Sequence, residues 1–181
     1  MHVSLDGFVT GPHGEVDWIT IDEEIFRDAM DLAATADTAL YGRTSYQMME
    51  NYWPTVLTHP ASTNLELQHA LWVENINKIV FSTTLEKTEW NNTKLIKENI
   101  PNEIRRLKSQ DGKSMMIVGS PHLTRSFMQW GLIDGYRINI NPVILKKGFS
   151  LFKNINDKTD LVLLKTKTFH SGVVGLYYEN R

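Results

Sequence analysis

Helical and extended segments alternate along most of this chain, and that alternation constrains the fold more than any other feature. Strands that alternate with helices favour a sheet of mostly parallel strands with helices on both faces. The end of the chain differs, because residues 161–180 form two extended runs on either side of His170-Ser171-Gly172. Such a pair predicts a hairpin of antiparallel strands. We therefore expect the α/β class, with a mostly parallel central sheet and an antiparallel C-terminal hairpin.

Hydrophobic spacing and turn residues predict the individual elements. Asp22 can cap a helix whose apolar positions run from Ile25 to Ala36, and further helices are expected from Thr44, at 64–73, at 102–109 and at 121–131. Strands are expected at 38–41, 78–83, 114–119 and 136–141, with loops at 7–18 and 54–60. A first strand within residues 1–5 is either short or preceded by residues missing from this sequence, and we favour the second.

Composition excludes several classes of function. A chain of 181 residues with 41% hydrophobic and 22% charged residues is expected to form one globular domain over residues 1–181. Its net charge of -2 disfavours nucleic acid as the main partner, because binding of phosphate backbones requires a basic face. There is no cysteine, which excludes disulfides and thiolate metal ligands. No apolar run approaches the ~18 residues of a membrane span and no export signal is present, so we expect no membrane association and a cytoplasmic location.

Two junctions between a strand and a helix are candidates for binding phosphate. In "LYGRTSY" a strand ends at Gly42, and Arg43 opens a helix; in "IVGSPHLTRSF" a strand ends at Gly119-Ser120 before the next helix. Helix N-termini attract anions, and glycine lets a ligand approach the backbone. The alternative is that each glycine makes only a tight turn and that serine caps a helix. Neither junction matches G-x-G-x-x-G or a Walker sequence, which disfavours a standard Rossmann or kinase site.

Asp6 is a candidate for a carboxylate in a cleft, because it follows an apolar strand and precedes Gly7. The alternative interpretation is an Asx turn at the end of that strand. The glycine-rich loop that follows is long enough to act as a lid, with Trp18 at its end.

Two other kinds of site are not supported by the sequence. The six histidines include no i, i+4 pair, so no metal site is expected. Without a G-x-S-x-G sequence, a Ser-His-Asp hydrolase is equally unsupported.

In combination, the motifs of this chain resemble those of the dihydrofolate reductase-like superfamily, in particular the bacterial branch similar to the RibD C-terminal domain, the reductase of riboflavin biosynthesis. The resemblance rests on "SLDGFVTGPHGEVDW", "LYGRTSY", "KIVFSTTL", "MMIVGSPHLTRSF", "GLIDGYRINI", "PVILKKGFSLF" and the closing hairpin. It implies a three-layer αβα fold, NADPH as the hydride donor and a homodimer. The hairpin residues that would supply apolar dimer surface are Val173, Val174, Leu176, Tyr177 and Tyr178.

The resemblance also implies which residues would bind the cofactor. The residues that match the segment at the cofactor's phosphates are Gly42, Arg43, Thr44 and Ser45, and those near the adenosine phosphate are Ser82 and Thr83. The residues around the pyrophosphate are Val118, Gly119 and Ser120, with Pro121, His122 and Leu123 at the start of the next helix. The loop that covers the nicotinamide is matched by Val9, Thr10 and Gly11. Ser120 stands where the family has a second glycine. Arg43, with Ser82 and Thr83 nearby, would donate hydrogen bonds to the 2′-phosphate that only NADPH carries, and would therefore favour NADPH over NADH.

The implied activity is an NADPH-dependent reduction of a small heterocyclic substrate. One candidate substrate is 5-amino-6-(5-phosphoribosylamino)uracil; the alternatives are a dihydrofolate reductase-type activity or a non-catalytic nucleotide-binding protein of the same fold. Asp6 matches the aspartate of the family's S-L-D-G motif, and Glu23 falls near the acidic residue of the first helix of dihydrofolate reductase. The proton would come from Asp6, Glu23 or solvent.

Overall fold

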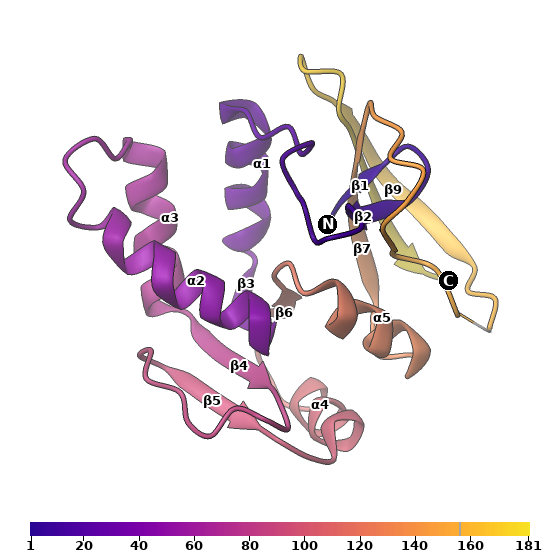
Figure 1. Ribbon diagram of the computed structural model, residues 1–181. Coiled ribbons are helices and arrows are strands. Elements are labelled where there is room, and N and C mark those ends of the chain that lie inside the picture. Colours follow the sequence, from indigo (N-terminus) through magenta and orange to yellow (C-terminus); the bar gives the residue numbers. More distant parts are fainter. Residues whose placement is uncertain (156) are drawn as a thin grey trace. The chain divides into compact units, whose positions relative to one another are not determined.

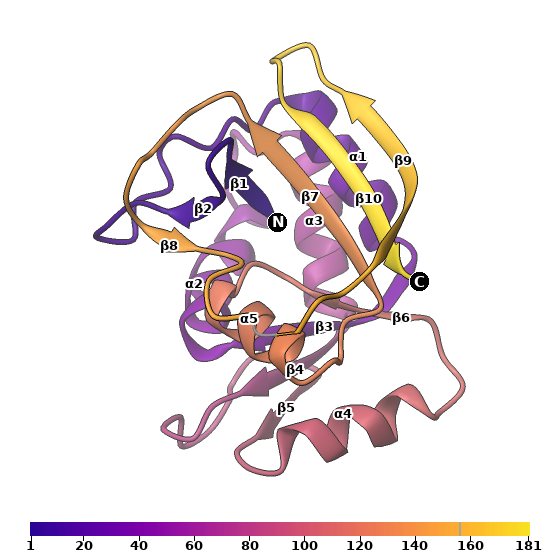
Figure 2. The same ribbon diagram turned by 90° about the vertical axis from the view of Figure 1, so that its right-hand side faces the viewer.

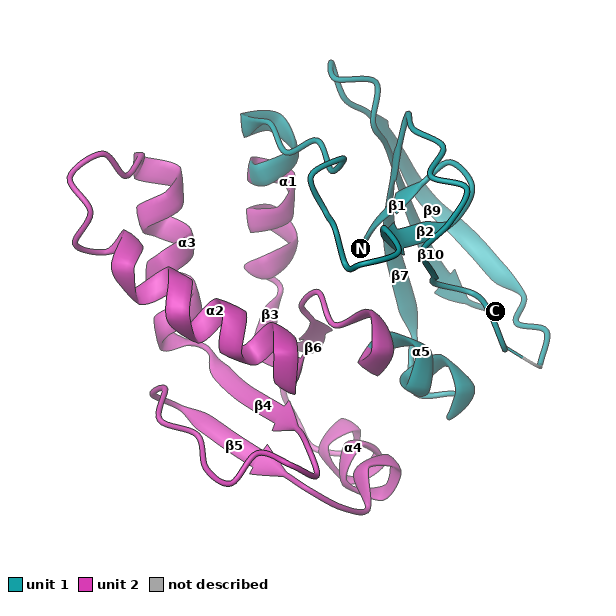
Figure 3. Cartoon of the chain, viewed as in Figure 1, with its two compact units in different colours: residues 1–26, 124–181 teal, residues 27–123 magenta. Residues whose placement is uncertain are grey.

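The chain forms two compact units, which Figure 3 colours separately. The computed structural model describes residues 1–155 and 157–181. Unit 1 comprises residues 1–26 and 124–181, and unit 2 comprises residues 27–123. Helix α1 (Glu23–Ala33) begins in unit 1 and continues into unit 2, while α5 (Pro121–Gln129) begins in unit 2 and continues into unit 1.

Unit 2 is built on a four-stranded sheet in the order β5-β4-β3-β6, in which every pair of neighbours is parallel (Figure 1). Its strands are β3 (Ala36–Gly42), β4 (Asn77–Phe81), β5 (Thr93–Ile96) and β6 (Ser114–Ile117). Its remaining helices are α2 (Arg43–Val56), α3 (Asn64–Asn75) and α4 (Ile100–Lys108). The parallel sheet expected from the sequence is confirmed.

The core of unit 2 forms where the buried central strands meet α2 and α3. Ala39, Tyr41 and Val80 are fully buried and pack with Tyr46 of α2 and Val73 of α3. Strands buried on both faces have continuous apolar sequences, as in "ALY" (residues 39–41) and "IVF" (residues 79–81). Burial of these side chains is the main force that holds the helices on the sheet.

Polar groups at the edge of this core are satisfied by specific partners. Tyr46 is 1% exposed, and its hydroxyl donates to Glu50 at 2.5 Å and accepts the backbone N–H of Trp90 at 3.2 Å. Lys78 is also 1% exposed. Its ammonium donates to the carbonyls of Glu74, Ile76 and Asn91 at 2.9–3.0 Å. The Glu74 carbonyl lies in the last turn of α3, Ile76 is the cap of that helix, and Asn91 precedes β5. Burial lowers the pKa of Lys78 to about 8.

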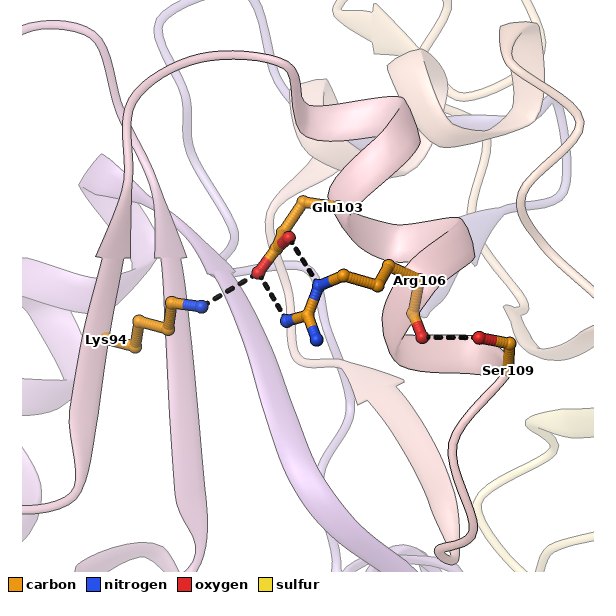
Figure 4. A network of polar contacts seen from close by, with 4 residues as sticks. All are labelled: Lys94, Glu103, Arg106 and Ser109. Atoms are coloured by element: carbon orange, nitrogen blue, oxygen red, sulfur yellow. Dashed lines mark hydrogen bonds and ion pairs between the residues drawn. The ribbon is translucent and has the colours of Figure 1, made fainter.

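A smaller network at the surface joins β5 to α4 (Figure 4). The carboxylate of Glu103 accepts from Lys94 at 2.8 Å and from two nitrogens of Arg106 at 2.8 Å. These hydrogen bonds lower the pKa of Glu103 to about 2. The Ser109 hydroxyl donates to the carbonyl of Arg106 at 2.8 Å and so completes the C-terminal turn of α4.

Unit 1 contains a four-stranded sheet in the order β1-β7-β10-β9 and a two-stranded sheet of β2 and β8 (Figure 2). The strands are β1 (His2–Ser4), β2 (Phe8–Thr10), β7 (Gly135–Asn141), β8 (Phe149–Ser150), β9 (Leu161–Thr168) and β10 (Val174–Asn180). Strand β1 is parallel to β7, whereas β10 is antiparallel to both of its neighbours, β7 and β9. The C-terminal hairpin is therefore confirmed, and with it the α/β class.

The two faces of the larger sheet of unit 1 differ in polarity. Val3 and Ile138 lie on one face and pack with Val9 and Leu151. On the other face His2 and Ser4 of β1 are in register with Asn139 and Asn141 of β7, and both asparagines are fully buried. The Asn141 amide accepts the backbone N–H of Thr20 at 3.0 Å and lies 3.2 Å from His2 Nδ1. Burial is the largest cause that lowers the pKa of His2 to about 4, so the ring is neutral.

Several expected boundaries were wrong, each for a local reason. Ala36 opens β3 instead of ending the first helix, because α1 stops at Ala33. Helix α2 continues through Pro54, which was expected to start a loop. The expected loop at 7–18 contains β2, and β5 was not expected at all. Strands this short carry too few residues for a clear alternating pattern.

No helix within residues 1–155 and 157–181 is both long and apolar enough to cross a membrane.

Candidate functional site

The two expected phosphate-binding junctions lie side by side in unit 2, at the carboxyl ends of β3 and β6. These strands are parallel neighbours with Leu40 opposite Ile117, and Val118 extends the pairing through its N–H to the Leu40 carbonyl at 3.1 Å. The chain leaves β3 towards β4 on one side, while β6 lies on the other side. The carboxyl ends of strands at such a reversal of strand order are the usual ligand site of an α/β sheet.

Two serines link the junctions to each other. The Ser120 hydroxyl accepts the backbone N–H of Gly42 at 2.9 Å, and the Ser45 hydroxyl accepts the backbone N–H of Ser120 at 3.0 Å. We call these two hydrogen bonds the serine clasp. They occupy the N–H groups of Gly42 and Ser120, so these two groups are not free to bind phosphate. The N–H groups of the first turn of α2 remain as the helix end that can face an anion, since no side chain caps this helix at Gly42.

The two glycines of the junctions differ in backbone conformation. Gly42 has a φ of -80°, which any residue adopts, and a Cβ built there would lie 3.5 Å from Ser120 Oγ and 3.8 Å from the Leu123 Cβ. Neither the backbone nor the packing of the chain therefore requires glycine at 42. Gly119 has a φ of +61°, in the left-handed region that favours glycine.

Arg43 is held next to the turn that follows β4. Its Nη1 donates to the Thr84 hydroxyl at 2.6 Å. Ser82 is 9% exposed, and its hydroxyl accepts the N–H of Thr84 at 3.2 Å and of Leu85 at 2.9 Å. Ser82 therefore shapes the turn, and Thr83 is exposed beside it. Thr84, which was not expected to contribute, orients the guanidinium; the only hint in the sequence was a hydroxyl residue next to Ser82 and Thr83.

An open hollow of about 490 Å³ lies next to Arg43 within unit 2. Its lining is mixed in charge: Arg43, Gln47, Glu50, Thr84, Leu85, Glu86, Lys87 and Glu89. Two of the three carboxylates already have partners, since Glu50 accepts from Tyr46 and Glu89 pairs with Lys87. The volume is within the range of ligand pockets, ~300–1,000 Å³.

In unit 1, Asp6 fixes the loop between β7 and β8. Its carboxylate accepts from the Ser4 hydroxyl at 2.6 Å, from the Leu145 N–H at 3.1 Å and from the Lys146 N–H at 2.8 Å. The Ser4 hydrogen bond is the largest cause that lowers the pKa of Asp6, and the two backbone N–H groups act in the same direction. The carboxylate is therefore ionised at neutral pH and serves as an anchor for backbone.

The segment expected to cover the nicotinamide also belongs to unit 1. Val9 is 3% exposed and Thr10 ends β2, which pairs with β8. The Gly11 N–H donates to the Glu15 carbonyl at 2.9 Å, and the Glu15 carboxylate accepts the His13 N–H at 2.8 Å. Part of the expected lid is thus a strand followed by a hydrogen-bonded turn.

The remaining candidate residues lie at the starts of helices. Glu23 is the exposed first residue of α1 in unit 1. Thr44 and His122 are exposed in the first turns of α2 and α5, whereas Leu123 is buried and lies against Gly42.

With this geometry established, comparison with known proteins identifies the family. Residues 1–175 match the family described as the RibD C-terminal domain. The chain belongs to this family. An uncharacterized Bacillus subtilis (strain 168) protein, YyaP, is 35% identical over 179 residues, which cover 97% of this chain and 90% of YyaP.

Two solved structures share the fold. A diaminohydroxyphosphoribosylaminopyrimidine deaminase/5-amino-6-(5-phosphoribosylamino)uracil reductase from Thermotoga maritima matches with a TM-score of 0.67 at 14% identity, over 99% of this chain and 55% of that one. Dihydrofolate reductase from Enterococcus faecalis, complexed with NADP(H), matches with a TM-score of 0.62 at 13% identity, over 99% of this chain and 93% of that one. The dihydrofolate reductase-like fold expected from the sequence is confirmed. Proteins of this family typically use NAD(P)H.

Proposed function

We propose that this protein is an NADPH-dependent reductase of a small heterocyclic substrate. The observation that carries the proposal is Gly42, where the fold leaves room for a side chain that is absent, directly before an uncapped helix N-terminus and Arg43. A ligand that approaches the backbone explains such a glycine. The family membership supports reductase chemistry, and the similarity to the Thermotoga maritima deaminase/reductase supports a heterocyclic substrate such as 5-amino-6-(5-phosphoribosylamino)uracil.

The residues of unit 2 fit the phosphates of a dinucleotide. The α2 N-terminus would face the pyrophosphate, because its first-turn N–H groups and helix dipole attract anions. Arg43, held by Thr84, would bind the 2′-phosphate that distinguishes NADPH from NADH, since a guanidinium pairs well with phosphate oxygens. When bound, NADPH supplies the hydride.

The chain's own contribution would be to bind and orient. Asp6 would hold the loop at Leu145–Lys146 in place as an ionised anchor. A carboxylate whose pKa is lowered is a poor proton donor at neutral pH, so the proton would come from Glu23 or from solvent.

The test is a calorimetric titration of NADPH and NADH against the wild-type protein, Arg43→Ala and Arg105→Ala. We expect the wild type to bind NADPH at least ~10-fold more tightly than NADH, and Arg43→Ala to lose that difference. Arg105 is an exposed arginine on α4 of the same unit, so Arg105→Ala controls for the loss of one positive charge. Equal dissociation constants in the wild type would refute the role of Arg43, and failure of both cofactors to bind would refute the reductase.

A further inference from the structure

The two-stranded sheet of β2 and β8 in unit 1 is too short to be stable by itself (Figure 2). Strand β2 has three residues and β8 has two. Isolated pairs of strands are at best marginally stable in water, and most strands in proteins are longer than these. Contacts with other residues of the unit must therefore hold the pair together.

Some of these contacts join the two strands to each other. Val9 of β2 is 3% exposed and packs with Leu151, which directly follows β8 and is fully buried. The Leu151 N–H donates to the Gly7 carbonyl at 3.1 Å. Gly148, directly before β8, lies so close to the Thr10 carbonyl that a Cβ built there would overlap it. These contacts fix β8 against β2, but they do not join the pair to a helix.

Arg125 makes that connection, from the part of α5 that belongs to unit 1. Its guanidinium lies over the Phe149 ring, with Cζ 3.7 Å from the ring centroid, and its Nη2 donates to the Ser150 carbonyl. Phe149 and Ser150 are the two residues of β8. A planar guanidinium can stack on an aromatic ring with its face and donate a hydrogen bond with its edge. Arg125 uses both, and it therefore holds each residue of β8.

The surroundings of Arg125 do not explain it as a residue selected for stability alone. Its Nε is buried and makes no hydrogen bond in the part of the chain that the structure describes. A buried donor without an acceptor costs free energy, which an apolar side chain of similar length would avoid. Gln129, one turn further along α5, already ties the chain beyond β8 to the helix, since it donates to the Asn154 carbonyl at 3.0 Å. Arg125 is better explained by the strand that it holds in place.

The segment held through β8 is the one that the family resemblance places over the nicotinamide. Each residue of β8 is paired with a residue of β2, Phe149 with Thr10 and Ser150 with Phe8. Residues 9–11 match the loop that covers the nicotinamide in the family. A shift of about 1 Å in a segment that positions a reacting group can cost about 100-fold in rate. The position of β2 therefore matters for the cofactor, and Arg125 controls it at one remove.

We propose that Arg125 is a positioning residue for the nicotinamide end of the cofactor. It clamps β8 to α5, and β8 keeps β2 in the place where β2 would cover the nicotinamide. This inference rests on the proposed function, because only a nicotinamide cofactor gives β2 this role. Arg125 acts through two strands, so its loss changes the binding of the nicotinamide and leaves the binding of the adenosine end as it was.

The first test needs no cofactor and follows amide hydrogen exchange by mass spectrometry. Arg125→Met retains an unbranched apolar stem and removes the guanidinium. We expect peptides that contain β2 or β8 to exchange at least ~10-fold faster in this variant, including the Leu151 amide, because the pair opens locally. Peptides from β7 and β10 should keep the wild-type rate.

The matched control is Arg137→Met, in the same unit. The Arg137 guanidinium also lies near an aromatic ring, with Cζ 5.5 Å from the Tyr177 centroid, but it belongs to β7. Its removal deletes the same kind of group and the same charge. It should leave the exchange of β2 and β8 unchanged.

The second test separates the two ends of the cofactor. NADPH carries the nicotinamide, whereas adenosine 2′,5′-bisphosphate carries the adenosine and the 2′-phosphate without it. In calorimetric titrations, Arg125→Met should raise the dissociation constant for NADPH at least ~10-fold and change that for the bisphosphate less than ~2-fold. A general loss of structure would weaken the binding of both ligands. Arg137→Met should bind both as the wild type does.

Unchanged exchange of β2 and β8 in Arg125→Met would overturn the proposal, and so would faster exchange without a selective loss of NADPH. In both cases the wild type still binds NADPH, so the proposed function survives. A wild type that binds neither ligand would instead refute the reductase, and this role of Arg125 with it.

Thermal melting establishes that each variant is folded. If Arg125→Met does not fold, Arg125→Lys decides, because it retains the charge and most of the stem and lacks the planar group. It should show the same two effects, the faster exchange and the selective loss of NADPH, to a smaller extent. Wild-type behaviour of a folded Arg125→Lys protein in both measurements would overturn the role of the guanidinium.

Discussion

The β3–α2 and β6–α5 junctions look alike in sequence, since each has a glycine between a strand and a helix, but the two glycines have different physical reasons. Gly119 is in the left-handed region, at a φ of +61°, where an L side chain is strained. Gly42 has an ordinary φ of -80° and an ordinary environment for a Cβ. A glycine that the fold requires says nothing about a ligand. A glycine that the fold does not require is instead explained by a ligand that approaches the backbone.

The largest expected effect comes from forcing a β-branched side chain onto the left-handed glycine. Gly119→Val should lower the free energy of unfolding by about 2–3 kcal/mol, because a β-branched residue strains at positive φ. Gly131 is a matched control: it has the same φ of +61°, and nothing lies within 4 Å of a Cβ built there. Gly131→Val should cost a similar amount in denaturant titrations. A Gly119→Val protein of unchanged stability would remove the backbone reason for this glycine and break the comparison.

The second largest effect is expected from Gly42→Ala, and it should change the affinity for NADPH instead of the stability of the fold. Gly42→Ala should change the free energy of unfolding by less than ~0.5 kcal/mol, because φ and the space around the Cβ permit alanine. The dissociation constant for NADPH should rise at least ~10-fold, equivalent to ~1.4 kcal/mol, because the methyl group occupies the space of the phosphate. Calorimetric titration measures the binding and thermal melting the stability. Normal binding by a folded Gly42→Ala protein would place the cofactor elsewhere.

The smallest effect concerns the serine clasp that joins the two junctions. Ser120→Ala leaves the Gly42 N–H without its acceptor and should lower the free energy of unfolding by about 1 kcal/mol. Ser45→Ala removes the other acceptor and should cost a similar amount. If the clasp acts as one unit, the double variant should cost less than the sum of the two single ones. An unchanged melting temperature for both single variants would show that water replaces the clasp without loss.

Long, strongly patterned segments were predictable from the sequence. The parallel strands "TALY" and "KIVF", the helix after Asp22 and the C-terminal hairpin all have a clear period or a turn residue, and all were found close to the expected place. The loop expected from Pro54 onwards was wrong at its start. Proline usually ends a helix, but α2 continues for two residues beyond Pro54. The four residues of β5 form a strand only because they pair with β4, which their own sequence does not reveal.

The positions of site residues were predictable where the order of strands and helices determines them. Their hydrogen-bond partners, which depend on contacts between distant parts of the chain, were not. The positions of Gly42 and Gly119 at strand ends follow from the order of elements, whereas their difference in φ does not. The contact of Thr84 with Arg43 joins residues 41 positions apart, and the contacts of Asp6 reach a loop 140 positions away. No local pattern encodes such partners. They appear only once the strands are placed beside one another.

The serine clasp can form only late in the synthesis of unit 2. Ser45 and Ser120 are 75 residues apart, so β3 and the start of α2 leave the ribosome long before their partner is translated. Until Ser120 has emerged and β6 has joined β3, the Gly42 amide has only water as a partner. The nascent chain therefore carries Gly42 and Arg43 without a completed junction for most of the translation of unit 2. Both junctions are completed together, at nearly the last residue of that unit.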